Sequence, residues 1–161
     1  MSEKSGYSSL QILLHWSVAI LVVFNYFYSE GMGKAAHQHL EGTTGPLPLN
    51  PQIHVWVGVA VLVLTLLRAV LRKTRGAPDV PGEGLFKMAG LWGHRLLYLL
   101  LLVVPLLGMA VWFLGLDAAG DIHALLANAL LILAGIHAAM GIFHQYVLKD
   151  GLLVRMMKPE R

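Results

Sequence analysis

The sequence predicts an all-α integral membrane protein, a bundle of four helices that run up-down-up-down. Of its 161 residues, 57% are hydrophobic and only 13% are charged, and the mean hydropathy is +0.65. One aqueous globule has too little interior for so many apolar side chains. Four stretches without Asp, Glu, Lys or Arg each reach the roughly 20 residues that cross a bilayer. These stretches are 10–29, 42–67, 96–116 and 122–148.

The four helices are expected at about 8–28, 52–73, 88–114 and 121–147, and they make a single transmembrane domain over 1–161. The first is interpreted as a retained helix and not a signal peptide, because His15 and Trp16 interrupt its middle and no small-residue cleavage motif follows. The second should begin near Pro51, after a loop, 30–52, that is rich in Gly and Pro and is expected to be irregular. Before the third helix, prolines break the helical pattern of 76–84.

Positive charge gathers on one side of the predicted bundle. All twelve Lys and Arg residues except Lys34 lie near the chain ends or around the connection between the second and third helices. The positive-inside rule therefore places both termini and this connection in the cytoplasm. The basic residues form no groove or stripe, so the pI near 9.3 gives no reason to expect nucleic acid as a partner. The absence of cysteine excludes disulfides, iron–sulfur clusters, thiolate zinc sites and covalently attached haem.

Histidine is unusually frequent for so apolar a chain. There are eight, and six lie on the predicted helices: His15, His54, His94, His123, His137 and His144. Ionisable side chains inside a membrane are candidates for functional sites. At about 1.5 Å per residue, His15 and His137 lie about 12 and 13 Å from the cytoplasmic ends of their helices. His54 and His123 both lie at the outer start of their helices, so the four form two pairs at two depths.

The fourth helix gives the stronger argument. Alternating steps of four and three place one seam of residues toward the bundle interior: His123, Ala127, Leu130, Ala134, His137, Gly141 and His144. A small residue follows each paired histidine one turn later: Ala19, Gly58, Ala127 and Gly141. Such residues suit a flat macrocycle and equally suit close helix packing. Arg68 follows His54 on the same face, where an unpaired cation is costly and a haem propionate would neutralise it.

These positions predict two b-type haems, each with its iron bound by imidazoles from two helices. His15 is expected to pair with His137, and His54 with His123, because imidazole is a good ligand for iron. Two protein ligands leave each iron no open position, which favours outer-sphere electron transfer over oxygen binding. His94 is a further candidate for the surroundings of the cytoplasmic haem.

Other interpretations of these histidines stay open at this point. A single His in a membrane helix can be a hydrogen-bonded contact between helices. His94, next to Arg95, can be an interfacial polar residue. His37 and His39 are expected in the outer loop, where their spacing is only weak evidence for zinc.

Several short motifs combine into a pattern that covers nearly the whole chain. They are 7–12 with His15 and Trp16, His54 with 67–68 and 71–72, 93–98, Pro105 and Gly108, His123 with 126–128, 135–139, and His144 with Tyr146, 149–150 and 153–157. In this pattern the chain resembles the bacterial cytochrome b561 family, four-helix cytochromes of the inner (plasma) membrane with two haems b and a link to quinone. The resemblance implies the same pairing of histidines. It also implies that a quinone, ubiquinone in the first instance, can exchange electrons at the cytoplasmic end, around His144 and Lys149. The alternative is that these two residues only anchor the helix end among lipid head groups.

Three classes of function compete. The leading one is a stand-alone electron-transfer protein that links an unidentified one-electron partner in the periplasm to the quinone pool. Some members of the family take electrons from superoxide, so a superoxide:ubiquinone oxidoreductase is one form of this function. The second class is the cytochrome b subunit of a larger membrane dehydrogenase or hydrogenase. The third is a proton or metal-ion transporter with a histidine relay, which the lack of Asp and Glu inside the membrane disfavours.

Overall fold

The computed structural model describes residues 6–42, 49–79 and 84–160. Over these residues the ordered elements are all helices and no strand is present, which confirms the predicted fold class. The helices are α1 (Ser9–Phe27), α2 (Met32–Leu40), α3 (Leu49–Arg75), α4 (Gly84–Leu114) and α5 (Ala119–Phe143). A π-helical segment, His144–Leu148, continues α5, and a short 3₁₀ turn, Val154–Met156, follows.

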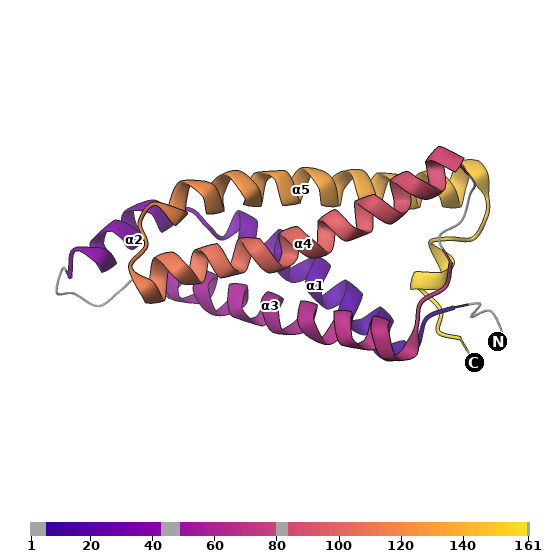
Figure 1. The fold of residues 1–161 in the computed structure, drawn as a ribbon, viewed down its shortest axis with the longest axis horizontal. Coiled ribbons are helices and arrows are strands. Elements are labelled where there is room, and N and C mark those ends of the chain that lie inside the picture. Colours follow the sequence, from indigo (N-terminus) through magenta and orange to yellow (C-terminus); the bar gives the residue numbers. More distant parts are fainter. Residues whose placement is uncertain (1–5, 43–48, 80–83, 161) are drawn as a thin grey trace.

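The four long helices lie side by side along the long axis of the molecule (Figure 1). They alternate in direction, so the two ends of the chain and the connection from α3 to α4 lie at one end, and α2 lies at the other. We call these the inner end and the outer end, after the orientation that the charges predict. All four helices are long and apolar enough to cross a membrane. The candidate spans are Ser9–Phe27, Leu49–Arg75, Lys87–Leu114 and Ala119–Leu148.

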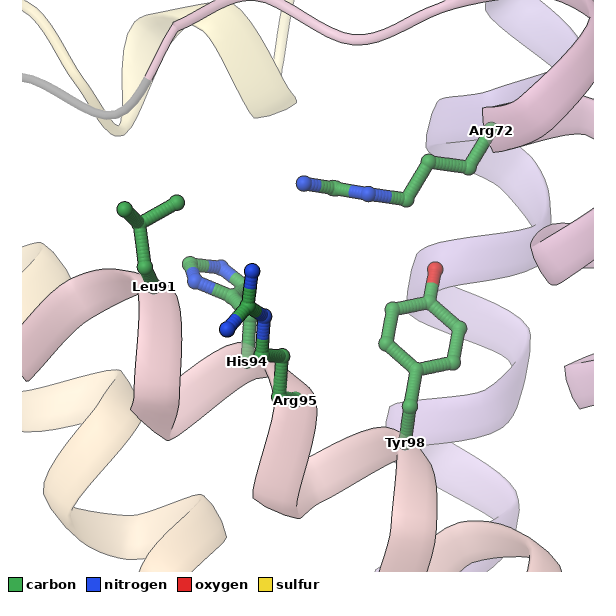
Figure 2. Close-up of a pocket in the computed structure, with 5 residues that line it drawn as sticks. All are labelled: Arg72, Leu91, His94, Arg95 and Tyr98. Carbon is green, nitrogen blue, oxygen red and sulfur yellow. The ribbon is translucent and has the colours of Figure 1, made fainter.

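The long helices differ in how closely they pack. α1 packs on α3, α3 on α4 and α4 on α5, whereas α1 and α5 make few contacts with each other. The α1–α5 side is therefore the loosest side of the bundle. Near the inner end, side chains of α3 and α4 line a half-open pocket of about 410 Å³ (Figure 2). It is lined by Arg72, Leu91, His94, Arg95 and Tyr98.

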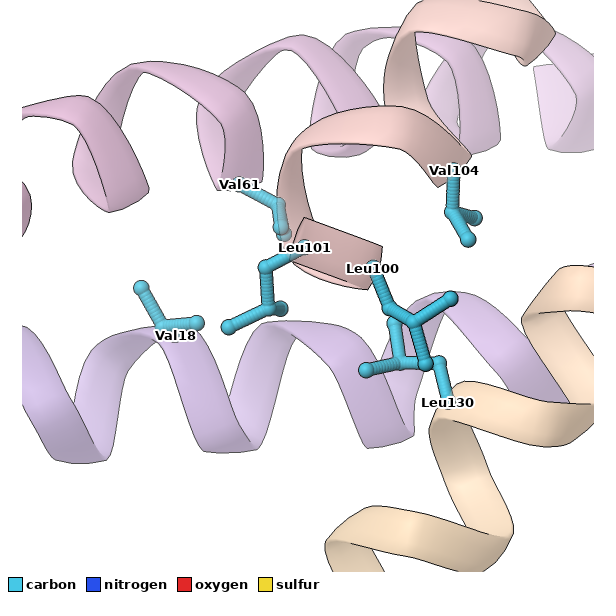
Figure 3. Close-up of a cluster of buried hydrophobic side chains, with 6 residues drawn as sticks. All are labelled: Val18, Val61, Leu100, Leu101, Val104 and Leu130. Carbon is cyan, nitrogen blue, oxygen red and sulfur yellow. The ribbon is translucent and has the colours of Figure 1, made fainter. Parts of the chain in front are cut away.

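An apolar layer crosses the middle of the bundle (Figure 3). It consists of buried side chains from all four long helices: Val18, Val61, Leu100, Leu101, Val104 and Leu130. Leu130 lies seven residues after His123 and seven before His137, so the layer lies halfway between the two predicted histidine levels. Inside a membrane such side chains stabilise a bundle mainly through van der Waals packing. Outward side chains such as Ile20 and Ile132, 65% and 66% exposed, are left to face lipid.

The observed helix ends differ from the predicted ones by a few residues. α3 begins at Leu49 and α4 at Gly84, both earlier than predicted. The α-helical part of α5 ends at Phe143, where the backbone widens into the π-helical segment. Helix ends depend on local capping and on contacts that hydropathy does not record.

The prediction of an irregular outer loop over 30–52 is wrong for α2. Gly31 takes a left-handed φ of +79°, which a residue with a side chain rarely adopts, and this lets the chain reverse and start a new helix. α2 packs against α4 and buries Ala35, so tertiary contact stabilises a helix too short to be stable alone. Residues 43–48 of the predicted loop and 80–83 of the predicted break lie outside the described residues.

Candidate functional site

The structure brings the four predicted haem ligands together as two pairs. The ring centres of His15 on α1 and His137 on α5 are 6.2 Å apart. Those of His54 on α3 and His123 on α5 are also 6.2 Å apart. All four residues are half-buried. The first pair lies toward the inner end and the second toward the outer end, with the apolar layer between them.

This spacing suits two imidazoles that share one metal ion. A bond from a metal to an imidazole nitrogen is about 2.0 Å long and that nitrogen lies about 1 Å from the ring centre, so two rings on opposite sides of an ion have centres roughly 6 Å apart. Within the part of the chain that the structure describes, no group of three or more His, Asp or Glu side chains could hold a metal ion. As ligands to a metal, each pair would offer two imidazoles, and a macrocycle would have to supply the others.

Backbone carbonyls hold both rings of the outer pair. The Nδ1–H of His54 donates to the carbonyl of Asn25 at 3.1 Å. Asn25 lies in the last turn of α1, where carbonyls lack a helical partner. The Nδ1–H of His123 donates to the carbonyl of Val104 at 2.8 Å, beside Pro105 on α4. Because a carbonyl can only accept, each neutral ring carries its proton on Nδ1 and leaves the Nε2 lone pair for a metal.

Three glycines near the histidines differ in how closely they are packed. A Cβ at Gly108 would lie 3.0 Å from Cε1 and 3.2 Å from Nδ1 of His123, so any larger residue would press on the ring. A Cβ at Gly58 or Gly141 would find its nearest neighbours at 3.7 Å and 4.0 Å, which are ordinary contacts. Close helix packing therefore does not require a glycine at either position, because a methyl group would fit there in ordinary contact.

The inner pair lies in more basic surroundings. Nδ1 of His15 is buried, and no described group forms a hydrogen bond with it. His94 on α4 lies 5.1 Å from His137, ring centre to ring centre, and donates from Nδ1 to a backbone carbonyl one turn earlier at 2.7 Å. Arg68 is half-buried, and its guanidinium carbon lies 5.5 Å from the centre of the Tyr98 ring.

Two polar groups at or beside the inner pair are wholly or partly buried at a cost in free energy. One is the buried His15 nitrogen without a partner, and the other is Arg68, which forms no ion pair with any carboxylate in the described ranges. Both fit a haem, because a haem is ligated by imidazole and carries carboxylates at its edge. The residues present therefore suit the cofactor that the sequence predicts.

His144 begins the π-helical segment and forms a dyad with Asp150, an acid that was not among the predicted site residues. Its Nδ1–H donates to Oδ2 of Asp150, and the amide of Leu152 donates to Oδ1 at 3.0 Å. The chain can turn back in this way because Lys149, itself exposed, takes a left-handed φ of 55°. Partial burial pushes the pKa of Asp150 upward, but the two hydrogen bonds outweigh it and hold that pKa below its ordinary value.

His37 and His39 lie on α2 and not in a loop. Nε2 of His37 lies 3.1 Å from Oε1 of Glu41. The ring of His39 stacks on Trp112 with 4.3 Å between ring centres, and its Nε2–H donates to the Trp112 carbonyl at 3.0 Å. The two histidines have different partners, and no zinc-binding cluster surrounds them among the described residues.

Comparisons with known proteins agree with this arrangement. The family model of prokaryotic cytochrome b561 matches residues 6–159. Cytochrome b562 of Cereibacter sphaeroides is 48% identical over 162 residues, which cover 99% of each chain. The probable superoxide oxidase CybB of Yersinia pestis is 31% identical over 96% of this chain and 97% of its own. Cytochrome b561 homolog 1 of Escherichia coli K12 is 30% identical over 94% of this chain and 96% of its own. The chain therefore belongs to the prokaryotic cytochrome b561 family, multi-pass membrane proteins that carry haem b and transfer electrons.

Proposed function

We propose that this cytochrome holds two haems b and moves electrons between a one-electron partner at the outer end and the membrane quinone pool at the inner end. His15 and His137 would hold the inner haem, and His54 and His123 the outer haem. The observation that carries the proposal is the equal 6.2 Å separation in both pairs, one pair on each side of the apolar layer. The distribution of Lys and Arg supports an orientation in a bacterial inner membrane with both termini in the cytoplasm.

A bound haem would supply reversible one-electron transfer, and the chain would control access and orientation. Two histidines as its ligands would leave the iron of each haem without a position for oxygen. The carbonyls of Asn25 and Val104 orient the outer rings through Nδ1, and a hydrogen bond of this kind also makes Nε2 a more basic ligand. The apolar layer excludes water from the path between the pairs.

We place the quinone reaction at the inner end, at the dyad of His144 and Asp150. Reduction of a quinone takes up protons together with electrons, and an imidazole can pass a proton near neutral pH. His144 continues the α5 seam beyond His137, roughly 10 Å further toward the inner end. The bond to Asp150 holds one proton on Nδ1 and leaves Nε2 available to the substrate, with Lys149 close by in the chain. Ubiquinone is the substrate that the family resemblance implies.

Superoxide is the first outer partner to test, because one relative is named a probable superoxide oxidase. The charges at the outer end act against it. The exposed residues of the outer end include one basic residue, Lys34, and four acidic ones: Glu30, Glu41, Asp117 and Asp121. Such a surface repels an anion in solution. Rapid mixing of the oxidised protein with superoxide, followed by the spectrum of reduced haem, decides whether superoxide is a donor.

Haem stoichiometry tests the proposal as a whole. The purified protein should contain two low-spin haems per chain, both released by acid acetone. His15→Ala or His137→Ala should remove chiefly the inner haem, and His54→Ala or His123→Ala the outer one. His37→Ala, on α2, should remove neither. A pyridine haemochrome assay with optical and EPR spectra measures each outcome, and a single haem per wild-type chain would overturn the proposal.

A separate experiment tests the quinone site. His144→Ala should keep both haem spectra but slow re-oxidation of the haems by a soluble ubiquinone analogue about a hundredfold, the typical loss of a proton-transfer group. Val147→Ala, an exposed position in the same π-helical segment, is the matched control and should keep the wild-type rate. A wild-type rate in His144→Ala would refute the quinone site and leave the haem assignment intact.

A further inference from the structure

The pocket between α3 and α4 has no role in the electron transfer proposed above. Figure 2 shows Arg72 reaching from α3 toward the space in front of His94 and Arg95 of α4, and the hydroxyl of Tyr98 points into the same space. At about 410 Å³, the pocket is in the size range of ligand sites.

The pocket is basic, and none of the described residues that line it is acidic. Arg72 and Arg95 line it, and Arg68 lies one turn from Arg72 on the same face of α3. The Arg95 guanidinium lies over the Trp92 ring at 4.9 Å. No carboxylate in the described ranges forms an ion pair with any of the three arginines. Like charges one turn apart destabilise a helix, and an anion with more than one negative charge would remove that repulsion.

The pocket also adjoins the inner histidine pair. His94 forms one wall and lies 5.1 Å from His137 between ring centres. Tyr98 forms another wall and lies beneath the guanidinium of Arg68. An anion in this pocket would therefore lie beside whatever the inner histidines bind.

We infer that the pocket binds the propionate carboxylates of the inner haem, through Arg72 and Tyr98, with Arg95 at the rim and Arg68 alongside. The inference rests on the proposed function, which supplies that haem. Two carboxylates on one edge of the macrocycle match a site with several guanidinium groups, and arginine binds carboxylates through paired N–H groups. The Tyr98 hydroxyl adds a neutral donor. The phosphate of an anionic phospholipid offers similar oxyanion chemistry, so the experiment has to separate the two.

Redox titration of Arg72→Gln protein tests the inference. Removal of a cation beside a haem favours the oxidised state, so the midpoint potential of the inner haem should fall and its retention during purification should weaken, while the outer haem is unchanged. Arg72→Lys should restore part of the potential, because it keeps the charge without the paired N–H groups. Tyr98→Phe should give a smaller fall, and it covers the case in which Arg72→Gln does not fold.

Lys73→Gln is the matched control, because Lys73 is exposed and lies outside the pocket. An inner haem with the same potential and retention in wild type, Arg72→Gln and Tyr98→Phe would overturn the inference and leave the proposed function intact. An equal fall in Lys73→Gln would also overturn it, since only the net charge of the inner end would then matter. Loss of bound phospholipid phosphorus from Arg72→Gln at unchanged potentials would assign the pocket to a lipid headgroup instead. A wild-type protein without an inner haem would refute both proposals.

Discussion

The two histidine pairs differ in how the chain holds their rings. Carbonyls of Asn25 and Val104 fix both outer rings, whereas Nδ1 of His15 in the inner pair has no partner in the described part of the chain. A ring that donates to a strong acceptor has a fixed orientation and is a better metal ligand. The outer site is therefore more completely preformed than the inner one, which depends more on the group that binds there.

Gly108→Ala should damage the outer site alone. The added methyl would lie 3.0 Å from Cε1 of His123, so the ring must move and its hydrogen bond to Val104 must weaken, and overpacking of this kind costs about 1–3 kcal/mol. The optical spectrum should show a shifted or weakened outer haem and an unchanged inner haem. Gly120→Ala, on the same pair of helices but with its nearest contact at 3.9 Å, should change neither. Selective loss of the inner haem in Gly108→Ala would contradict this account.

Arg68→Leu should lower the midpoint potential of the inner haem or weaken its retention. The substitution removes a half-buried cation beside the inner pair and leaves an apolar side chain that suits a membrane helix. Arg68→Lys keeps the charge and should shift the potential less. Potentiometric titration with optical detection measures both variants. If both haems titrate as in the wild type, Arg68 belongs to the lipid interface.

The residues of the histidine pairs could be predicted from the sequence, but the groups that hold their rings could not. Helix periodicity is a local property, so it places His123 and His137 on one face of a predicted helix without any knowledge of the fold. The carbonyl of Val104 meets His123 only after α4 and α5 have packed. That contact depends on the relative position of two helices, which periodicity does not specify.

At the scale of elements, the π-helical segment shapes the inner end of α5. A π-helix is wider than an α-helix and is frequent at functional sites. Here it leads into the left-handed Lys149, which turns the chain so that Asp150 meets His144. The sequence predicted an ordinary helix to 147, because hydropathy does not distinguish the two kinds of backbone. α2 could not be predicted from hydropathy either, because it has only nine residues and is too polar to stand out in a hydropathy profile.

The hydrogen bond between His144 and Asp150 should persist as the pH falls into the range in which an aspartate ordinarily titrates. The pKa of Asp150 is lowered in the folded protein, so the stability that the dyad contributes is complete above the ordinary pKa and is lost only as the pH falls through the lowered one. The Nδ1 proton of His144 should therefore stay hydrogen-bonded from neutral pH to about pH 4. Imidazole ¹⁵N NMR of labelled protein in nanodiscs measures this. Asp150→Asn should lack the charged acceptor at every pH, and a wild-type bond lost well above about pH 5 would contradict the lowered pKa.

The molecule as a whole has two unlike ends. The chain termini and the α3–α4 connection share the inner end with nearly all the basic residues, and α2 lies at the outer end. The lengths of the apolar stretches and the positions of the charged residues do not depend on how the chain folds. The sequence was therefore sufficient to predict the number of spans and this asymmetry. It did not predict which helices touch, and the loose contact between α1 and α5 follows only from the three-dimensional packing.

Reporter fusions should show the C-terminus in the cytoplasm. Green fluorescent protein joined after residue 161 should fluoresce, and alkaline phosphatase joined there should be inactive, because it folds only after export. Alkaline phosphatase inserted after Glu41, at the end of α2, should be active. Immunoblots control for the amount of each fusion. The reverse pattern would invert the molecule in the membrane and would place His144 on the periplasmic side.

The apolar layer between the histidine pairs has an electrical consequence. The two levels lie about 21 Å apart along α5, within a hydrocarbon core about 30 Å thick. The six aliphatic side chains of the layer offer no path for an ion to accompany an electron. In the proposed function, each electron that passes between the pairs therefore carries its charge through most of the membrane field, where a full crossing is worth about 2.3 kcal/mol at 100 mV. The distribution of electrons between the outer and inner levels would then depend on the membrane voltage, with one direction of transfer favoured in an energised cell and that preference lost in a depolarised one.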